Sequence, residues 1–397
     1  MPMKEKGGVF VSVVLGMLTA FGPFVTDFYL PVLPDMAEWF STSSSAASLS
    51  MTMGMLGLAL GQLFIGPLTD KYGRKWILVA SMVLFCIASV LCVYAPDIYM
   101  FNAMRLLQGI GGSGGLVISR SMAADMFSGR KLLEFMALLM AINGVAPVLA
   151  PVIGGTTARF FSWRGVFVLL TCIGVVLMIC CLMLRETLAT EKRLKGSVAL
   201  AYKRLFTILR HPAFAQATVA MTFCYFAFFS YITSSTFIIQ KVYGLNALQF
   251  SICFGVNGTL LMISSAMARK FRNPSAGMRI GVSVFTSGAI LIALSLWFAL
   301  PLLIVLASFA IMLIGFGLLA PVVTSQALDG EHDNAGAASA IIGATAFLSG
   351  ALVSPIVTIG NVAVSTGIVI AVSALLCFVL IERLRRIDFR ILKSEKV

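Results

Sequence analysis

Charged side chains are scarce in this 397-residue sequence, making up 11% of it against about 25% in a typical soluble domain. Histidine occurs only as His211 and His332, and both lie in polar stretches. The eight cysteines show neither metal-ligand spacing nor the pattern of a disulfide framework. These absences argue against a soluble enzyme, a metal site and a secreted disulfide-rich fold. We therefore expect no enzyme activity, no cofactor, no metal ion and no nucleic-acid partner.

Long apolar runs take the place of charge. Hydrophobic residues make up 59% of the chain, the mean hydropathy is +0.99, and many runs could cross a bilayer core of about 30 Å. The sequence predicts an all-α membrane protein with twelve transmembrane helices. The first six are Val9–Leu33, Ala46–Leu68, Trp76–Tyr94, Ile98–Ser119, Phe135–Phe160 and Gly165–Leu184. The second six are Ala213–Ile239, Leu248–Met267, Ile280–Leu300, Leu302–Leu328, Ala335–Ile359 and Val362–Ile381.

Lysine and arginine indicate how these spans are oriented. With the N-terminus inside, 25 of the 29 basic residues fall in cytoplasmic segments, as the positive-inside rule requires. We therefore predict that both termini are cytoplasmic and that the basic loops face lipid headgroups. The longest polar interval follows the sixth span. It predicts an N-terminal bundle over residues 1–185, a linker over 186–212, and a C-terminal bundle with a basic tail over 213–397.

Two charges lie well inside predicted spans, Asp27 in the first and Arg105 in the fourth. Both are about 10 Å from the predicted outer surface, at a rise of about 1.5 Å per residue. We expect them to be close together. One interpretation is a static ion pair between two helices. The other is a proton-coupling site, because burial and a neighbouring guanidinium act on a carboxyl in opposite directions.

The loop between the second and third spans carries a specific motif, GPLTDKYGRK, from Gly66 to Lys75. It resembles the signature of the major facilitator superfamily, whose fold has two pseudo-symmetric six-helix bundles. The resemblance implies a conformational-gating role for five residues of this loop: Gly66, Asp70, Gly73, Arg74 and Lys75. By its position, Asp125 is the expected partner of Arg74.

Two further motifs narrow the resemblance. NGVAPVLAPVIGG is similar to a motif of proton-driven exporters in that superfamily, and it assigns an antiporter role to Asn143, Pro147, Pro151, Gly154 and Gly155. TDFYLPVLP, from Thr26 to Pro34, resembles the Bcr/CflA drug-resistance branch, which is associated with bicyclomycin and chloramphenicol-type compounds. The arginine of the fourth span also fits, since RLLQGIGG resembles the family motif around a membrane-buried arginine.

Aromatic and polar side chains within the spans are candidates for substrate contacts. The seventh span is the most aromatic and hydroxyl-rich of the twelve. The predicted substrate-binding residues are Tyr29, Met55, Gln108, Asn143, Tyr225, Phe229, Tyr231, Asn257 and Gln326.

We therefore expect proton-coupled export of small amphiphilic antimicrobials across the inner membrane by alternating access. The expected partners are the substrate, protons and the lipid bilayer, and the chain is expected to be a monomer. The alternative is an exporter or symporter of a sugar or another small metabolite on the same fold. The few Asn and Gln residues within the spans argue against a sugar site. An intramembrane enzyme is disfavoured because no span contains histidine.

Overall fold

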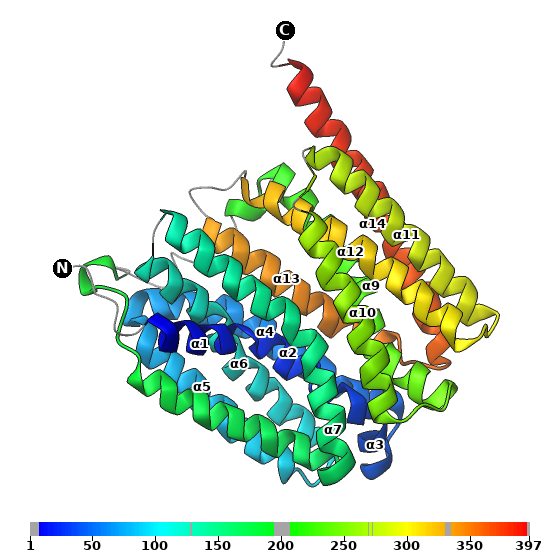
Figure 1. The fold of residues 1–397 in the computed structure, drawn as a ribbon, viewed down its shortest axis with the longest axis horizontal. Coiled ribbons are helices and arrows are strands. Elements are labelled where there is room, and N and C mark those ends of the chain that lie inside the picture. Colours follow the sequence, from blue (N-terminus) through cyan, green and yellow to red (C-terminus); the bar gives the residue numbers. More distant parts are fainter. Residues whose placement is uncertain are drawn as a thin grey trace. The chain divides into compact units, whose positions relative to one another are not determined.

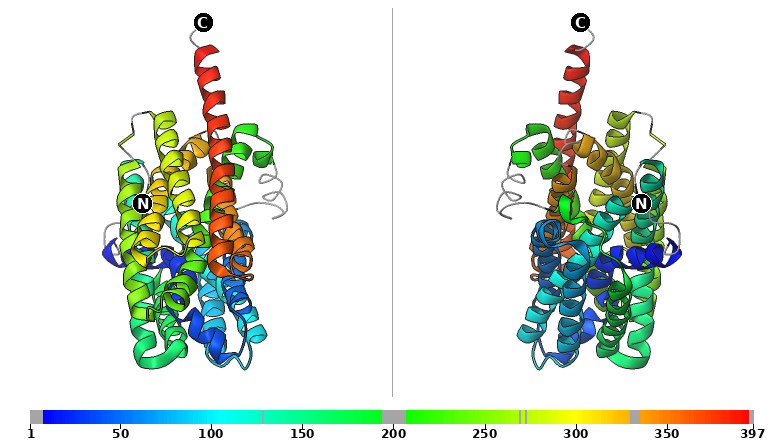
Figure 2. Two further views of the ribbon diagram at one scale, coloured as in Figure 1. Left: turned by 90° about the vertical axis from the view of Figure 1, so that its right-hand side faces the viewer. Right: turned by 90° about the vertical axis from the view of Figure 1, so that its left-hand side faces the viewer.

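The computed structural model describes residues 8–127, 129–193, 207–268, 270–271, 273–329 and 335–394, and every regular element in these ranges is helical (Figure 1). Helices satisfy their own backbone polar groups, as a chain in lipid must. The first-half elements are α1 Gly8–Thr19, α2 Phe21–Thr26, η1 Leu30–Val32, α3 Leu33–Trp39, α4 Ser44–Tyr72, α5 Arg74–Val93, α6 Ile98–Met126, α7 Gly129–Met183 and η2 Thr190–Lys192. The second-half elements are α9 Pro212–Phe237, the π-helix η3 Ile238–Val242, α10 Ala247–Ala268, α11 Pro274–Trp297, α12 Leu302–Asp329, α13 Ala335–Ile356 and α14 Val362–Ser394. Helix α14 is one continuous helix and extends beyond the predicted end of its span at Ile381 (Figure 2).

The described helices agree with the predicted membrane spans. Nine of them are long and apolar enough to cross a membrane, or ten when the bent pair formed by Gly8–Thr19 and Phe21–Trp39 is taken as one span. One of the nine is a 40-residue stretch of α7, Gly144–Met183, that covers most of the fifth and nearly all of the sixth predicted span. The remaining predicted span corresponds to α6, in which Arg105 and a glycine-rich stretch lower the hydropathy.

The first span is interrupted, whereas the sequence predicted one uninterrupted helix. It bends by 42° between α1 and α2, and α2 itself ends at Thr26. Proline explains both interruptions, because its ring clashes with the carbonyl four residues earlier in a helix. Pro23 acts in this way on Thr19, the last residue of α1, and Pro31 acts on Asp27, which follows α2 directly. Asp27 therefore lies at a break in a membrane helix.

The fifth and sixth spans are joined by a very tight turn at Ser162. This residue has φ 59° and ψ −177°, which is not helical, although the helices on either side run directly into it. That backbone conformation favours glycine over any residue with a Cβ. In the second half, the turn that separates α13 from α14 contains Gly360 with φ 66°.

The chain divides into two compact units, whose bounds differ from the predicted domains at residues 33–52 and within the predicted linker 186–212. Unit 1 comprises Met1–Val32 and Met53–Tyr202, and unit 2 comprises Leu33–Thr52 and Lys203–Val397. The prediction had placed residues 33–52 with the N-terminal bundle. Within unit 2 these residues contact the second-half helices: Lys241 forms an ion pair with Glu38 at 3.4 Å, and the Ser354 hydroxyl donates to the Ser48 carbonyl at 3.4 Å.

Candidate functional site

Arg105 of α6 is fully buried in unit 1 and is held by neutral groups. Its Nη2 donates to the Val25 carbonyl at 2.5 Å, and its Nη1 donates to the side-chain oxygen of Gln108. The guanidinium carbon lies 4.1 Å from the centre of the Tyr29 ring and 5.8 Å from that of Phe167. Such cation–ring contacts stabilise a charge that has left water.

The orientation of Gln108 is determined by a further contact. Its Nε2 donates to the Ser89 hydroxyl at 2.7 Å, so its oxygen is directed toward Arg105. A glycine on α4 provides the space for the guanidinium, since a Cβ at Gly54 would lie 2.8 Å from Nη2. The Nε of Arg105 has no hydrogen-bond partner among the described residues. The site therefore holds a buried cation in which one nitrogen, Nε, has no acceptor among the described residues.

Asp27 lies beside this site, but the expected contact with Arg105 does not form. The carboxyl is 3% exposed, and the Thr26 hydroxyl donates to its Oδ1 at 2.7 Å. No ion pair between described residues joins Asp27 to Arg105. The break in the first span explains this: because α2 ends at Thr26, the Val25 carbonyl lacks a helical donor and accepts the guanidinium instead. Arg105 thus contacts residues on both sides of Asp27, namely Val25 and Tyr29.

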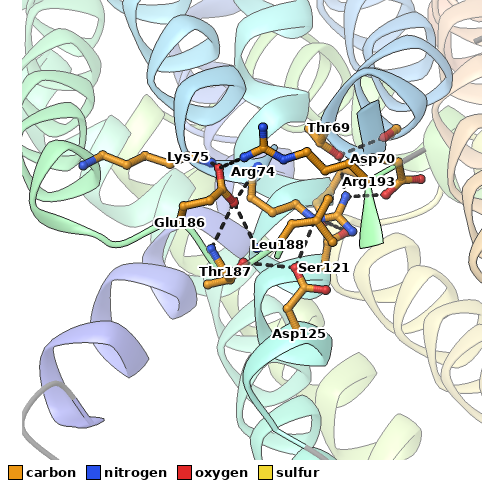
Figure 3. A network of polar contacts seen from close by, with 12 residues as sticks. Thr69, Asp70, Arg74, Lys75, Ser121, Asp125, Glu186, Thr187, Leu188 and Arg193 are labelled. Carbon is orange, nitrogen blue, oxygen red and sulfur yellow. Dashed lines mark hydrogen bonds and ion pairs between the residues drawn. The ribbon is translucent and has the colours of Figure 1, made fainter. Parts of the chain in front are cut away.

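A second group of charges lies where α4 and α6 end and α5 begins, in unit 1 (Figure 3). Arg74 is at its centre, paired with Asp70 at 2.5 Å and with Asp125 at 3.1 Å. Its Nη1 also donates to the Thr69 hydroxyl at 2.7 Å. The predicted contact between Arg74 and Asp125 is confirmed. The Lys75 side chain instead extends over the Trp76 ring, with its Nζ 5.3 Å from the ring centre.

Glu186, to which the sequence analysis assigned no role, completes this charge network. Its carboxylate accepts the backbone N–H groups of Arg74 at 2.9 Å, Lys75 at 3.3 Å, Thr187 at 3.0 Å and Leu188 at 3.0 Å. Burial raises the pKa of Glu186, but these four donors outweigh it and hold the pKa below its ordinary value. The first two N–H groups begin α5, so Glu186 caps that helix.

Gly73 makes this capping possible. It precedes α5 with φ +97°, a conformation that residues with a Cβ rarely adopt. A Cβ here would collide with the Glu186 carboxylate and lie 2.9 Å from Nη2 of Arg193. Arg193 in turn lies 3.8 Å from Glu186. The glycine itself was the signal that the sequence offered, because a glycine before a helix has no capping side chain and leaves N–H groups that need a distant acceptor. At Gly66, by contrast, a Cβ would meet nothing within 4 Å.

The predicted antiporter motif lies in α7 and contacts the broken first span. A Cβ at Gly154 would overlap the carbonyl oxygen of Phe28, the residue after Asp27. Gly155 is buried, and Pro147 and Pro151 both lie inside the helix. The side chain of Asn143 is outside the described residues. Close packing of α7 therefore supports the chain directly beside the buried carboxyl.

The predicted substrate residues fall into separate clusters. In unit 1, Tyr29 and Gln108 contact Arg105, and Met55 is fully buried. In unit 2, Tyr225 and Phe229 have ring centroids 6.4 Å apart. Within the described ranges, no group of three or more His, Cys, Asp or Glu side chains is placed to bind a metal ion.

Two of the unit 2 candidates, Tyr231 and Asn257, satisfy one another in its core. Tyr231 stacks on Phe254 with ring centroids 5.4 Å apart, and its hydroxyl accepts from Nδ2 of Asn257 at 3.4 Å. Both side chains are buried. Gln326 of α12 is half-buried. Tyr231 and Asn257 therefore have clear packing roles, as does the buried Phe229, whereas the half-buried Tyr225 remains a candidate for contact with a ligand.

Comparisons with known proteins agree with this architecture. A family model described as Major Facilitator Superfamily matches residues 13–355. The chain is 34% identical over 374 residues to the "Uncharacterized MFS-type transporter YdgK" of Bacillus subtilis, with 92% of this chain and 93% of the relative covered. It is 26% identical over 368 residues to the "Bicyclomycin resistance protein homolog" of Haemophilus influenzae, with 89% and 90% covered. A solved bacterial homolog of the human lysosomal transporter Spinster shares the fold, with a TM-score of 0.74 at 15% identity over 96% of this chain and 98% of that one.

Proposed function

Because this chain belongs to the major facilitator superfamily, and is thus a multi-pass membrane transporter and not an enzyme, we propose that it exports small amphiphilic antimicrobials in exchange for protons. In this proposal it works by alternating access in the cytoplasmic membrane, with both termini in the cytoplasm. The bicyclomycin resistance protein homolog among its relatives supports a drug as substrate.

The observation that carries the proposal is the position of Asp27. Its carboxyl is buried without an ion-pair partner among the described residues, at a break in a membrane helix, between the two residues that hold Arg105. Burial favours the protonated carboxyl, whereas an ionised one is stabilised by the Thr26 hydroxyl and gains further from approaching the guanidinium. Small changes in the broken segment therefore control whether Asp27 binds a proton. Non-helical backbone at membrane depth is itself a common feature of transporter sites.

The charge network around Arg74 is the proposed conformational gate. Arg74 links the end of α4 to α6 through Asp70 and Asp125, and Glu186 links the end of α7 to the start of α5. Four helix ends of unit 1 thus depend on a few side chains. Changing their charges is expected to alter the rate of conformational exchange rather than the proton site.

Reconstitution in liposomes with an imposed pH gradient tests the proton carrier. Asp27→Asn is expected to abolish uphill accumulation of chloramphenicol, because the amide cannot titrate, while exchange of chloramphenicol down its own gradient continues. Asp27→Glu, which keeps a titratable group, is the matched control and is expected to retain measurable uphill transport. Undiminished uphill transport by Asp27→Asn would eliminate Asp27 as the carrier.

The metabolite alternative is tested in the same vesicles. Proton-driven movement of a sugar such as xylose, with no movement of chloramphenicol, would replace drug export by metabolite transport and leave the role of Asp27 to be judged on that substrate.

A further inference from the structure

Residues 33–52 pack in unit 2, although the chain on both sides of them belongs to unit 1. Helix α4, Ser44–Tyr72, is continuous, yet its first turns lie in unit 2 and the rest of it lies in unit 1. A continuous helix can follow only one of two moving bodies. If the units move separately, as alternating access requires, residues 33–52 must leave unit 2 or α4 must bend.

The contacts of this segment within unit 2 include an exposed ion pair and a long hydrogen bond. Lys241 pairs with Glu38 at 3.4 Å, and 40% and 75% of the two side chains are exposed. The Ser354 hydroxyl of α13 donates to the Ser48 carbonyl at 3.4 Å, and it shares a hydrogen bond of 3.0 Å with the Thr233 hydroxyl of α9. Exposed ion pairs and long hydrogen bonds add little stability, so they suit a joint that opens and closes.

The lysine of this ion pair belongs to a π-helix. The element η3, Ile238–Val242, continues α9 and carries Lys241. The N–H of Tyr243 donates to the carbonyl of Ile238, five positions earlier, at 3.1 Å, whereas an α-helix would use the carbonyl four positions earlier. A single π turn contains one residue more than an α turn, and such turns occur frequently at functional sites.

Conversion of η3 to α-helix would move Lys241 away from Glu38. Each residue of an α-helix advances the chain by about 100° around the axis. Removing the extra residue from the turn therefore rotates its C-terminal end by about that angle relative to α9. The lysine would then point to another side of the helix, and the ion pair would be lost. The π turn thus offers two settings for one contact.

We propose that residues 33–52 form a latch on unit 2, held at η3, and that this π-helix converts to α-helix when the latch opens. The proposal rests on the alternating access proposed above, and it identifies the elements that separate during the cycle. In the proposed orientation the latch is on the outer side of the membrane, because Ser48 is near the start of the second predicted span and Ser354 is near the end of the eleventh. The latch is closed while the carrier is open to the cytoplasm, and it opens to release substrate.

Cross-linking tests whether the latch must open. Glu38→Cys and Lys241→Cys are combined in the full chain, reconstituted in liposomes, and joined by a short bismaleimide. The cross-link is expected to lower uphill transport of chloramphenicol at least about tenfold, because a closed latch stops a conformational step of the cycle. The two single-cysteine variants, treated in the same way, are the controls and should keep their transport. Unchanged transport by the cross-linked protein would overturn the latch.

Deletion of Gln240 tests the change of helix register, since it removes the extra residue of the turn. Ser354 is fully buried, so labelling of Ser354→Cys by a membrane-impermeant maleimide, read by mass spectrometry at this position, reports opening. The deletion should raise the labelling rate at least about threefold. Gln240→Ala is the matched control, because it removes the side-chain hydrogen bond to Thr236 at 2.9 Å but keeps the length, and it should change the rate by less than about twofold. Equal rates in the deletion and the alanine variant would overturn the register change.

Hydrogen exchange tests the same turn without a deletion. Amide exchange of the peptide covering residues 238–245 is compared in the double-cysteine protein before and after cross-linking. Exchange should become at least about threefold slower, because the closed latch keeps the Tyr243 N–H on the Ile238 carbonyl. Equal exchange in the two states would contradict interconversion of η3.

The outcomes separate this inference from the function on which it rests. If the wild type moved no chloramphenicol, drug export would be rejected, whereas labelling at Ser354→Cys and exchange of residues 238–245 would still decide the latch. If chloramphenicol moved and the cross-link left transport unchanged, the latch alone would be rejected.

Discussion

In each unit, the backbone of a phenylalanine lies directly against a glycine of the neighbouring helix. In unit 1 a Cβ at Gly111 of α6 would lie 2.6 Å from the backbone nitrogen of Phe85 in α5. In unit 2 a Cβ at Gly315 of α12 would overlap the same atom of Phe285 in α11. A glycine also lies against a serine of a second helix in each unit. In unit 1 these are Gly61 of α4 and Ser113 of α6, and in unit 2 they are Gly317 of α12 and Ser264 of α10. These small residues allow helices to approach closely in lipid.

The centres of the units differ although these packing contacts repeat. In unit 1 the Tyr29 ring lies 4.1 Å from the guanidinium carbon of Arg105. In unit 2 the ring centroids of Tyr231 and Phe309 are 4.9 Å apart. Phe309 precedes Gly315 on α12 by the same number of positions as Arg105 precedes Gly111 on α6. An aromatic residue packs without a desolvation cost, whereas a buried guanidinium is expensive. The comparison indicates that glycine contacts hold the helices together in both units, and the costly charge in unit 1 supports the role proposed for Arg105.

The largest expected effect on transport comes from replacing the residue at the centre of unit 1, Arg105. Arg105→Ala should lower pH-driven transport of chloramphenicol by about 100-fold or more, equivalent to about 2.7 kcal/mol, with expression largely intact. Phe309→Leu, the corresponding change in unit 2, should lower transport only a few-fold while costing about 1 kcal/mol of stability. Transport assays in liposomes and thermal unfolding in detergent measure both quantities. Equal transport losses in the two variants would remove the functional asymmetry.

Replacing the contact glycine by alanine should lower the free energy of unfolding to a similar extent in both units. Gly111→Ala and Gly315→Ala are each expected to lower the free energy of unfolding by about 1–3 kcal/mol, because the new methyl group meets backbone that cannot move aside. Gly66→Ala is the matched control, since its methyl group meets nothing within 4 Å, and it should change stability by about 0.5 kcal/mol or less. A destabilisation confined to one unit would contradict the shared packing.

The starts of the equivalent helices α5 and α11 are capped differently, and the difference predicts a pH dependence. Asn273 caps α11 locally, accepting from the N–H of Ser275 at 3.0 Å, whereas Glu186 caps α5 from the end of α7. Glu186→Gln and Asn273→Ala should each cost about 1–2 kcal/mol near neutral pH.

Only the Glu186 contribution should disappear in acid. The pKa of this carboxyl is lower in the folded protein than its ordinary value of 4.5. Its stabilising effect is therefore complete above that value and is lost as the pH falls through the lowered folded value. Thermal unfolding across this range should show wild type and Glu186→Gln converging, while wild type and Asn273→Ala remain separated. Parallel curves for the first pair would refute the capping role.

The smallest expected effect concerns the turns that join paired spans. Unit 1 has Ser162 with φ 59° where unit 2 has Gly360 with φ 66°. Ser162→Gly should stabilise the protein by up to about 1 kcal/mol, because glycine adopts this conformation without strain. Gly360→Ser is the reciprocal variant and should destabilise by a similar amount. Melting temperatures in detergent report both changes, and a lower value for Ser162→Gly would argue against strain at this turn.

Sequence reasoning succeeded where the physical cause is local. Apolar length predicted the helices of both units, and the GPLTDKYGRK loop predicted the contact of Arg74 with Asp125. It did not find Glu186, because the N–H of Arg74 and the carboxylate that binds it are separated by 112 positions in the chain. Pro23 and Pro31 carried the signal for the broken first span, but hydropathy alone treats that stretch as continuous.

By itself, the sequence determined that this chain is a helical membrane transporter with one acid and one base deep in its spans, because lipid demands apolar helices and makes every exception conspicuous. Only the tertiary structure decided what those exceptions contact. Arg105 binds the Val25 carbonyl and not the Asp27 carboxylate, since a helix break two residues away supplies an acceptor that no pattern of residue types encodes. The same structure joined residues 33–52 to the second unit, because hydrogen bonds and ion pairs form between groups that are close in space, whatever their separation along the chain.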